Sequence, residues 1–141
     1  MKKLIFPVLA LILPFFIWPI EIFLPYPAFI EELAKAVLII LVVREGLSFK
    51  EGLKISFLLG AFFALTETIL YLFNLELVGS IDMFLVRLFL TIILHSLTAA
   101  IFFTFAFSKK LFFICFGLVI TIVIHYLFNY AIPFLAVRLP L

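Results

Sequence analysis

Long apolar runs separated by short polar breaks dominate the chain. There are five such runs, and they cover residues 4–24, 27–43, 53–77, 81–107 and 111–137. About 20 apolar residues suffice to cross a bilayer as a helix. The breaks carry helix-ending or charged residues, among them Gly46, Gly52 and Ser108-Lys109-Lys110. The pattern predicts an all-α, polytopic transmembrane helix bundle of about five spans.

Prolines mark the first two runs. Pro7, Pro14 and Pro19 fall inside the first, which we therefore expect to be bent or partly irregular. Pro27 suits the first turn of the second helix, which is short for a span and is expected to start below the membrane surface. The basic start followed by an apolar run without a small-residue cleavage site predicts an uncleaved signal anchor over residues 1–26.

Basic residues predict the orientation of the chain. They cluster before the first run, between the second and third, and between the fourth and fifth, as Lys2-Lys3, Arg44 to Lys54, and Lys109-Lys110. In a five-span chain these three places share one side, which the positive-inside rule makes cytoplasmic. The opposite side carries Glu21, Glu76 and Asp82. We expect a cytoplasmic N-terminus, an external C-terminus, Glu31 near the outer surface, and His95 and His125 nearer the midplane.

Composition agrees with a membrane protein of one domain. Hydrophobic residues make up 68% and charged residues 13% of the 141 residues, against about 25% charged in soluble domains. The mean hydropathy is +1.45. The formal net charge of +2 is too small to indicate a nucleic-acid partner. The lone Cys115 excludes a disulfide framework within the chain.

Polar residues recur at helical spacing inside four of the runs. The second run has Glu31 and Lys35 one turn apart, next to Glu32. The other three stripes are Gly60, Phe63, Glu67, Tyr71 and Asn74; Arg87, Thr91, His95 and Thr98; and Thr121, His125 and Asn129. Four stripes predict one shared interior within residues 27–137, whereas the first run has no stripe and is expected to be a lipid-facing brace.

Leaving these charges in lipid would be costly. A charged side chain at the bilayer centre costs about 2.5–3.5 kcal/mol, so four would cost about 10 kcal/mol, comparable with the stability of a domain. They must face one another or a water-filled cavity. Carboxylates that activate water and groups that stabilise an oxyanion are what peptide hydrolysis needs. Glu31 or Glu32 can activate water, and His125 with Asn129 can hold the oxyanion; which glutamate is the base stays open here.

A metal is the second option for this interior. Glu67, His95 and His125 form a His₂Glu set, a ligand combination found at catalytic zinc. The HExxH pattern is missing, so each ligand would come from a different helix, as bundle sites permit. A metal-free route stays open beside it.

Other interpretations explain some of these residues without catalysis. Glu31, Glu32 and Lys35 alone could form a buried ion-pair network, and Arg87 could anchor to headgroups or pair with Glu67 in a structural role. Intramembrane Glu and His residues also serve proton-relay transporters, although the internal repeats common in transporters are missing. A non-catalytic membrane scaffold is the third class.

Four motifs in order resemble the PrsW family of intramembrane proteases. Glu31-Glu32-Leu33-Ala34-Lys35 resembles its EExxK motif, and Gly60 to Tyr71 resembles the second motif, with Glu67 and Tyr71 in matching places. Arg87 with His95-Ser96-Leu97-Thr98-Ala99 resembles the third, and His125-Tyr126-Leu127-Phe128-Asn129 resembles the last. The wider superfamily of CAAX prenyl endopeptidases and bacteriocin-processing proteases usually has Arg in place of Lys35 and His in place of Glu67.

The resemblance implies an endopeptidase in a prokaryotic cell membrane that cleaves a membrane protein or a membrane-attached peptide. It implies that Glu31 or Glu32 activates water and that Glu67, His95, His125 and Asn129 complete the site, supported by Lys35, Arg87 and Tyr71. PrsW-type proteins are catalogued as metalloproteases, whereas a metal-free glutamate mechanism is the alternative account for the CAAX enzymes. Because this chain is shorter than usual members, it is expected to be either a minimal core or one subunit of a homo-oligomer.

Overall fold

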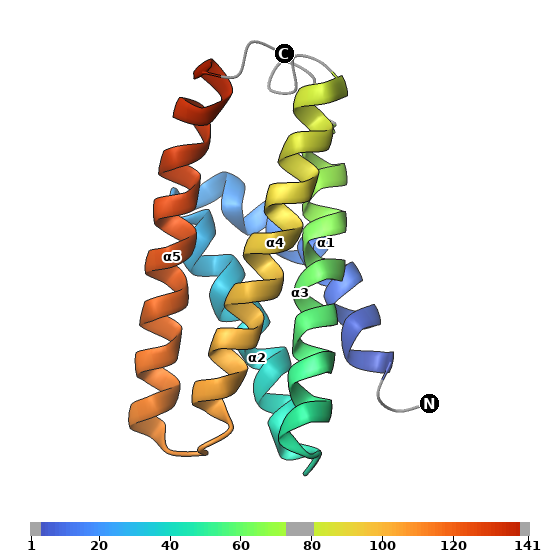
Figure 1. Cartoon of the computed structure of the whole chain (residues 1–141), viewed down its shortest axis with the longest axis vertical. Coiled ribbons are helices and arrows are strands. Elements are labelled where there is room, and N and C mark those ends of the chain that lie inside the picture. Colours follow the sequence, from blue (N-terminus) through green and yellow to red (C-terminus); the bar gives the residue numbers. More distant parts are fainter. Residues whose placement is uncertain (1–3, 73–80, 139–141) are drawn as a thin grey trace.

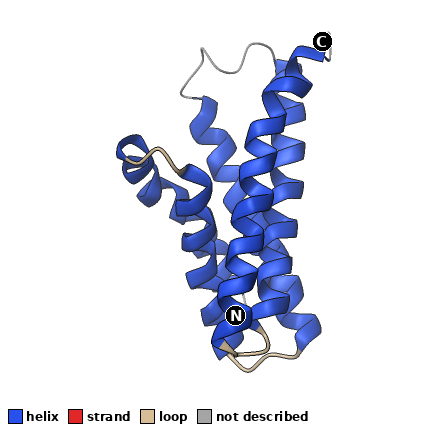
Figure 2. Ribbon diagram, turned by 90° about the vertical axis from the view of Figure 1, so that its left-hand side faces the viewer, coloured by secondary structure: helices blue, strands red, loops and turns tan. Residues whose placement is uncertain are grey.

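The computed structural model describes residues 4–72 and 81–138, and these ranges contain five α-helices and no strand (Figures 1 and 2). The helices are α1 (Ile5–Phe23), α2 (Pro27–Arg44), α3 (Phe49–Leu72), α4 (Ile81–Ala106) and α5 (Leu111–Arg138). The predicted all-α polytopic bundle is confirmed. Asn74 and Glu76 lie outside the described residues, and so does the side chain of Tyr71.

Local residues determine where α2 ends and where α3 begins. Gly46 follows α2 with φ +69°, a left-handed conformation that glycine adopts without strain at a helix C-terminus. The start of α3 lies four residues before the predicted one. Ser48 Oγ caps the helix by accepting a hydrogen bond from the Glu51 N–H at 3.3 Å, and it also donates to Glu51 Oε2 at 3.1 Å.

Four of the five helices are long and apolar enough to cross a membrane, namely α1, α3, α4 and α5. The remaining helix, α2, carries Glu31, Glu32, Lys35 and Arg44 within 18 residues. Figure 1 shows the turn between α1 and α2 well below the upper ends of α4 and α5, so α2 starts at mid-height of the bundle. The same view places the α2–α3 and α4–α5 connections, with their basic residues, together at the lower end.

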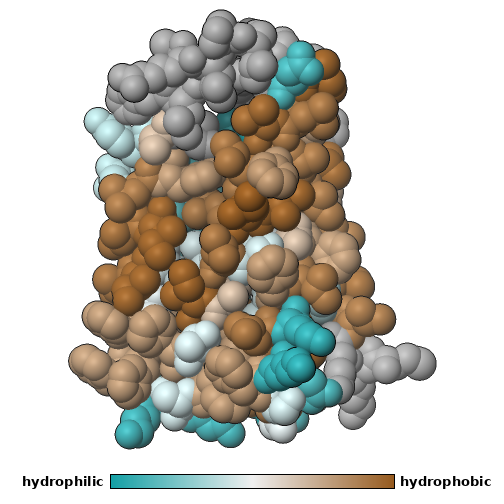
Figure 3. All heavy atoms as spheres, in the orientation of Figure 1, coloured by the Kyte–Doolittle hydropathy of each residue, from teal (hydrophilic) through white to brown (hydrophobic). Residues whose placement is uncertain are grey.

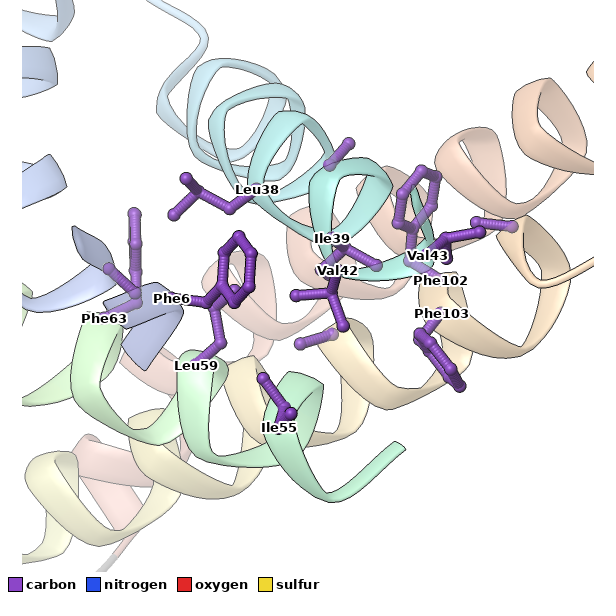
Figure 4. Close-up of a cluster of buried hydrophobic side chains, with 14 of the residues drawn as sticks. Phe6, Leu38, Ile39, Val42, Val43, Ile55, Leu59, Phe63, Phe102 and Phe103 are labelled. Carbon is purple, nitrogen blue, oxygen red and sulfur yellow. The ribbon is translucent and has the colours of Figure 1, made fainter. Parts of the chain in front are cut away.

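The outer surface of the bundle is largely apolar. Large hydrophobic side chains such as Phe16, Phe89 and Phe112 are more than 60% exposed, as expected where acyl chains replace water. Figure 3 shows this hydrophobic belt, with hydrophilic residues gathered at the lower end. Ile39, Leu59, Phe102 and their neighbours pack together as the apolar core (Figure 4).

The first helix is part of the bundle as well as a lipid-facing element. Phe6, Ala10 and Ile17 are buried in the described structure, and α1 packs mainly along α3. Pro14 and Pro19 lie inside a helix that is continuous from Ile5 to Phe23. Thr66 of α3 donates its hydroxyl to the carbonyl of Leu11 at 2.6 Å, three residues before Pro14. A hydroxyl from a neighbouring helix is a usual partner for backbone near a membrane proline.

Candidate active site

Five ionisable side chains from three helices meet in the centre of the bundle. Glu31, Glu32 and Lys35 project from α2, His95 from α4 and His125 from α5, and each is at most 3% exposed. The helical spacing along α2 puts its three charged residues on the inner side, against α4 and α5. The two imidazoles therefore lie beside the Glu31 carboxylate, with each Nε2 3.7 Å from Glu31 Oε2.

The Lys35 ammonium group has three partners. Its Nζ atom lies 2.6 Å from Glu32 Oε1, 2.8 Å from His95 Nδ1 and 3.0 Å from Thr98 Oγ1. An ammonium group has three hydrogens to donate and no lone pair to accept with. Lys35 thus uses all its donors on one carboxylate, one ring nitrogen and one hydroxyl, which compensates the cost of burying its charge.

Glu32 is the acceptor at the centre of this network. Its Oε1 atom accepts from Lys35 and from Thr98 Oγ1 at 3.2 Å, and it lies 2.9 Å from His125 Nδ1. A carboxylate held by three partners from three helices is fixed in place. Glu32 therefore links α2, α4 and α5.

These contacts define the tautomer of each imidazole. Because Lys35 can only donate, His95 Nδ1 must accept, and the ring hydrogen of a neutral His95 lies on Nε2. His125 is reversed: Nδ1 faces the Glu32 carboxylate and donates to it, so its Nε2 keeps a lone pair. The two rings lie edge to face with centroids 4.9 Å apart.

Two further carboxylates face the free ring nitrogens. Glu31 Oε2 lies 3.7 Å from Nε2 of both His95 and His125, and Glu67 Oε2 lies 2.6 Å from His95 Nε2. Glu31 Oε2, Glu67 Oε2 and His95 Nε2 are all buried without an aligned hydrogen bond. Buried polar atoms normally have a partner, so this convergence leaves room for water, an ion or a substrate group.

Gly60 controls how closely α3 approaches the site. A Cβ atom at Gly60 would overlap the backbone carbonyl of His95. Only glycine therefore permits the observed contact between α3 and α4, as is common where membrane helices pack tightly. The contact brings Phe63 to the site, with its ring centroid 5.2 Å from that of His95 and 5.4 Å from Lys35 Nζ.

Comparison with known families gives one match. The model of the PrsW family of intramembrane metalloproteases matches residues 8–140. This chain belongs to the PrsW family. It is accordingly an integral membrane protein of an intramembrane protease family. Neither the curated proteins nor the solved structures gave a match.

The PrsW family is described as metalloproteases, and the central cluster has the residue types of a metal site. One ligand atom each from Glu31, His95 and His125 lies within 4.8 Å of the others. Ligands at about 2.0–2.1 Å from a tetrahedral ion stand roughly 3.4 Å apart, close to the 3.7 Å from Glu31 Oε2 to each histidine. The residues fit in donor type and spacing.

This ligand group differs from the predicted one in its carboxylate. The sequence suggested Glu67 with the two histidines, whereas the structure groups Glu31 with them and holds Glu67 against His95 alone. His125 is oriented as a ligand, with its other nitrogen held by a carboxylate. His95 could bind an ion through Nε2 only as the tautomer with its hydrogen on Nδ1, the nitrogen that Lys35 Nζ approaches at 2.8 Å.

A cavity of about 220 Å³ opens beside the site between α1, α2 and α3. Glu31 and Glu67 form part of its wall, and most of the rest is apolar. It is roomy enough for several water molecules. The cavity lies toward the turn between α1 and α2, at the opposite end of the bundle from the basic connections.

The structure does not bring Asn129 to the cluster. Its side chain is exposed, and it lines a second cavity of about 460 Å³ between α5 and the start of α2. One helical turn beyond His125, the side chain has rotated away from the interior toward the apolar surface. The role of oxyanion donor that the sequence suggested for Asn129 has no geometric support here.

The structure describes the side chains of the supporting residues Lys35 and Arg87, but not that of Tyr71. Arg87 on α4 is half-buried, and its charge acts on Glu67. The backbone of Tyr71 belongs to α3, whereas its side chain is not described. Thr91, Thr98 and Thr121 are buried. Of these threonines, Thr98 also bonds to Lys35 and Glu32, which spacing alone did not reveal.

Glu21 is the site residue that sequence reasoning missed. It lines the same cavity as Glu31 and Glu67 and is half-buried near the end of α1. Its place near the end of the first apolar run predicts a position on the outer side of the bundle. Its position as the one charged residue within Ile5–Phe23 was the available signal.

Proposed function

We propose that this PrsW-family protein is an endopeptidase that hydrolyses a peptide bond of a membrane-associated protein, with Glu31 as the water-activating base. The observation that carries the proposal is the Oε2 atom of Glu31. It is buried, has no hydrogen-bond partner, borders a cavity and lies 3.7 Å from both imidazoles. Glu32, in contrast, is already occupied by Lys35, Thr98 and His125.

The reaction follows from these positions. A water in the cavity gives a proton to Glu31 while its oxygen attacks the carbonyl carbon of the scissile bond. The oxygen of the resulting tetrahedral intermediate would share the hydrogen of His95 Nε2–H, whose position Lys35 fixes, with Glu67 Oε2 at 2.6 Å from that nitrogen. The carbon–nitrogen bond then breaks, and the leaving amine takes the proton from Glu31. The products are a new carboxyl terminus and a new amino terminus.

Glu67 and His125 complete the arrangement. Glu67 contacts His95 Nε2 and limits the rotation of that ring. His125 presents the lone pair of Nε2 toward Glu31, so it can accept a proton that Glu31 holds. If a divalent ion is bound, Glu31, His95 and His125 would hold it, and Glu67 would be the nearest carboxylate left to act as the base. Such an ion supplies Lewis-acid polarisation of water and of the carbonyl.

The proposal is tested by mapping new protein termini. Membranes from cells that express the wild-type protein are compared with membranes containing Glu31→Gln, and new amino termini are identified by mass spectrometry. General acid–base groups contribute about 10²–10⁴-fold, so new termini should fall by about 100-fold or more in the variant. Glu45→Gln, at an exposed position after α2, is the matched control and should cleave like the wild type.

Two results would overturn this proposal. One is an identical set of termini in wild type and a folded Glu31→Gln variant. The other is that no new amino terminus depends on the protein, either in cell membranes or in vesicles that contain the purified protein and membrane-anchored peptides. The second result would favour a non-catalytic scaffold.

A further inference from the structure

Glu21 has a buried carboxylate oxygen with no partner. The residue is half-buried, and its Oε1 atom is fully buried without a hydrogen bond. It shares the 220 Å³ cavity with Glu31 and Glu67, so three carboxylates from three helices border one space. Glu31 is itself 3% exposed with an unpartnered oxygen. Each of the three carboxylates of this cavity, with Glu67 included, therefore has a buried oxygen that lacks a hydrogen-bond partner.

The rest of the wall is apolar. Pro14, Ile17, Trp18 and Ile22 of α1 face Phe63 and Leu70 of α3 across the cavity. No basic side chain belongs to the described lining; Arg87, whose charge acts on Glu67, is on α4 and outside it. Carboxyl groups in such surroundings either take up a proton or are compensated by a cation or by hydrogen-bond donors.

We propose that this cavity binds the basic side chain of a substrate residue, lysine or arginine, next to the scissile bond, with Glu21 as the residue that determines this specificity. The inference rests on the proposed endopeptidase function. A basic side chain lays its methylene stem along an apolar wall while its charged end meets carboxylates. The Trp18 ring adds a surface that attracts cations. Since Glu31 borders the same cavity, a side chain bound there leaves its own backbone beside the proposed base.

An inorganic cation fits this cavity less well. Calcium takes six to eight oxygen ligands, and magnesium takes six including several waters. The lining of this cavity is three carboxylates among seven apolar side chains. An organic cation needs fewer oxygens and gains from the apolar wall.

Binding can be measured without any substrate, because Trp18 is the single tryptophan of the chain and lines the cavity. The protein in lipid nanodiscs is titrated with n-butylguanidinium, and tryptophan emission is recorded. The same titration is made with neutral n-pentanol, with Mg²⁺ and with Ca²⁺. We expect a saturable change with n-butylguanidinium that Glu21→Gln weakens by about tenfold or more. Glu45→Gln should bind like the wild type.

Three results would overturn the cation site. The first is equal affinity of the wild type and a folded Glu21→Gln variant for n-butylguanidinium. The second is a fluorescence change with n-pentanol as large as that with n-butylguanidinium. The third is displacement of n-butylguanidinium by Mg²⁺ or Ca²⁺ in the wild type but not in Glu21→Gln. Thermal unfolding of each variant shows whether it is folded, so a loss of binding through misfolding is recognised.

Cleavage provides the second measurement. Membrane-anchored peptides that carry lysine near the scissile bond are compared with peptides that carry norleucine at the same position. Wild type should prefer lysine in kcat/KM by about tenfold or more. Glu21→Gln should lose that preference through a lower kcat/KM for the lysine peptide. A preference that survives in Glu21→Gln contradicts the inference, whereas Glu21-dependent binding without any cleavage refutes the proposed function and leaves the cation site standing.

Discussion

His125 Nδ1 lies 2.9 Å from Glu32 Oε1, although 93 residues separate the two along the chain. The contact ties the last helix to a short central helix that is too charged to cross a membrane by itself. The same oxygen also accepts a hydrogen bond from Lys35, so the two glutamates of the EExxK sequence have different roles. Glu32 with Lys35 organises the interior, whereas Glu31 has a buried oxygen without a hydrogen-bond partner beside a cavity.

Removing Glu32 should destabilise the bundle. Glu32→Ala leaves the Lys35 ammonium buried without its carboxylate, and breaking a buried pair in this way costs about 3–5 kcal/mol. We expect a clearly lower thermal unfolding midpoint in detergent. Glu45→Ala, at an exposed position, should leave the midpoint unchanged.

The double variant Glu32→Leu/Lys35→Met checks the physical cause. Apolar replacement of both partners should recover most of the stability, because neither charge is then left unpaired. A double variant less stable than Glu32→Ala would show that the ion pair is not the reason for the loss.

Gly60→Ala should separate α3 from α4. Its Cβ would overlap the His95 backbone carbonyl, which cannot move away as a side-chain end can. Overpacking costs about 1–3 kcal/mol, and we expect this loss in chemical or thermal unfolding. Gly52→Ala on the same helix is the control, since its Cβ meets the outer edge of the Phe103 ring. Equal stabilities of the two variants would contradict the close approach described for α3 and α4.

Metal binding distinguishes the two candidate ligand sets. Zinc affinity of protein purified without chelators is measured by competition with a chromogenic chelator. If Glu31, His95 and His125 hold the ion, Glu31→Gln should weaken zinc binding by about tenfold or more. Glu67→Gln should weaken it by less than that. A larger loss in Glu67→Gln would restore the set that the sequence suggested.

The orientation of the chain is accessible to cysteine labelling. In a Cys115→Ala background, Ser108→Cys in the α4–α5 connection should react only from the cytoplasmic side. Asp82→Cys, at the opposite end of α4, should react from outside. The reverse pattern would overturn the orientation derived from the basic clusters.

The apolar pattern predicted the helices well because each run is bounded by breakers that act locally. The second helix was predicted from Pro27 to residue 43 and extends from Pro27 to Arg44. The start of α3 was predicted too late because the polar residues near Ser48 were interpreted as loop. The Ser48–Glu51 cap was visible in the sequence and would have corrected this.

The site was less predictable because it depends on how helices lie relative to one another. Helical spacing selected Glu31, His95 and His125, which the structure brings together. Spacing could not reveal that α2 starts at mid-height, which puts Glu31 beside the histidines. Nor could it reveal that Glu21 turns inward or that Asn129 faces outward, since these depend on the rotation of α1 and α5 against their neighbours.

The most direct test of the account compares Glu31→Gln with Glu32→Gln in one cleavage assay, each checked for folding by its unfolding transition. The account predicts that Glu31→Gln folds like the wild type and cleaves about 100-fold more slowly or worse. It predicts that Glu32→Gln loses stability and keeps measurable cleavage wherever it remains folded. A folded Glu31→Gln protein that cleaves at the wild-type rate would contradict the account.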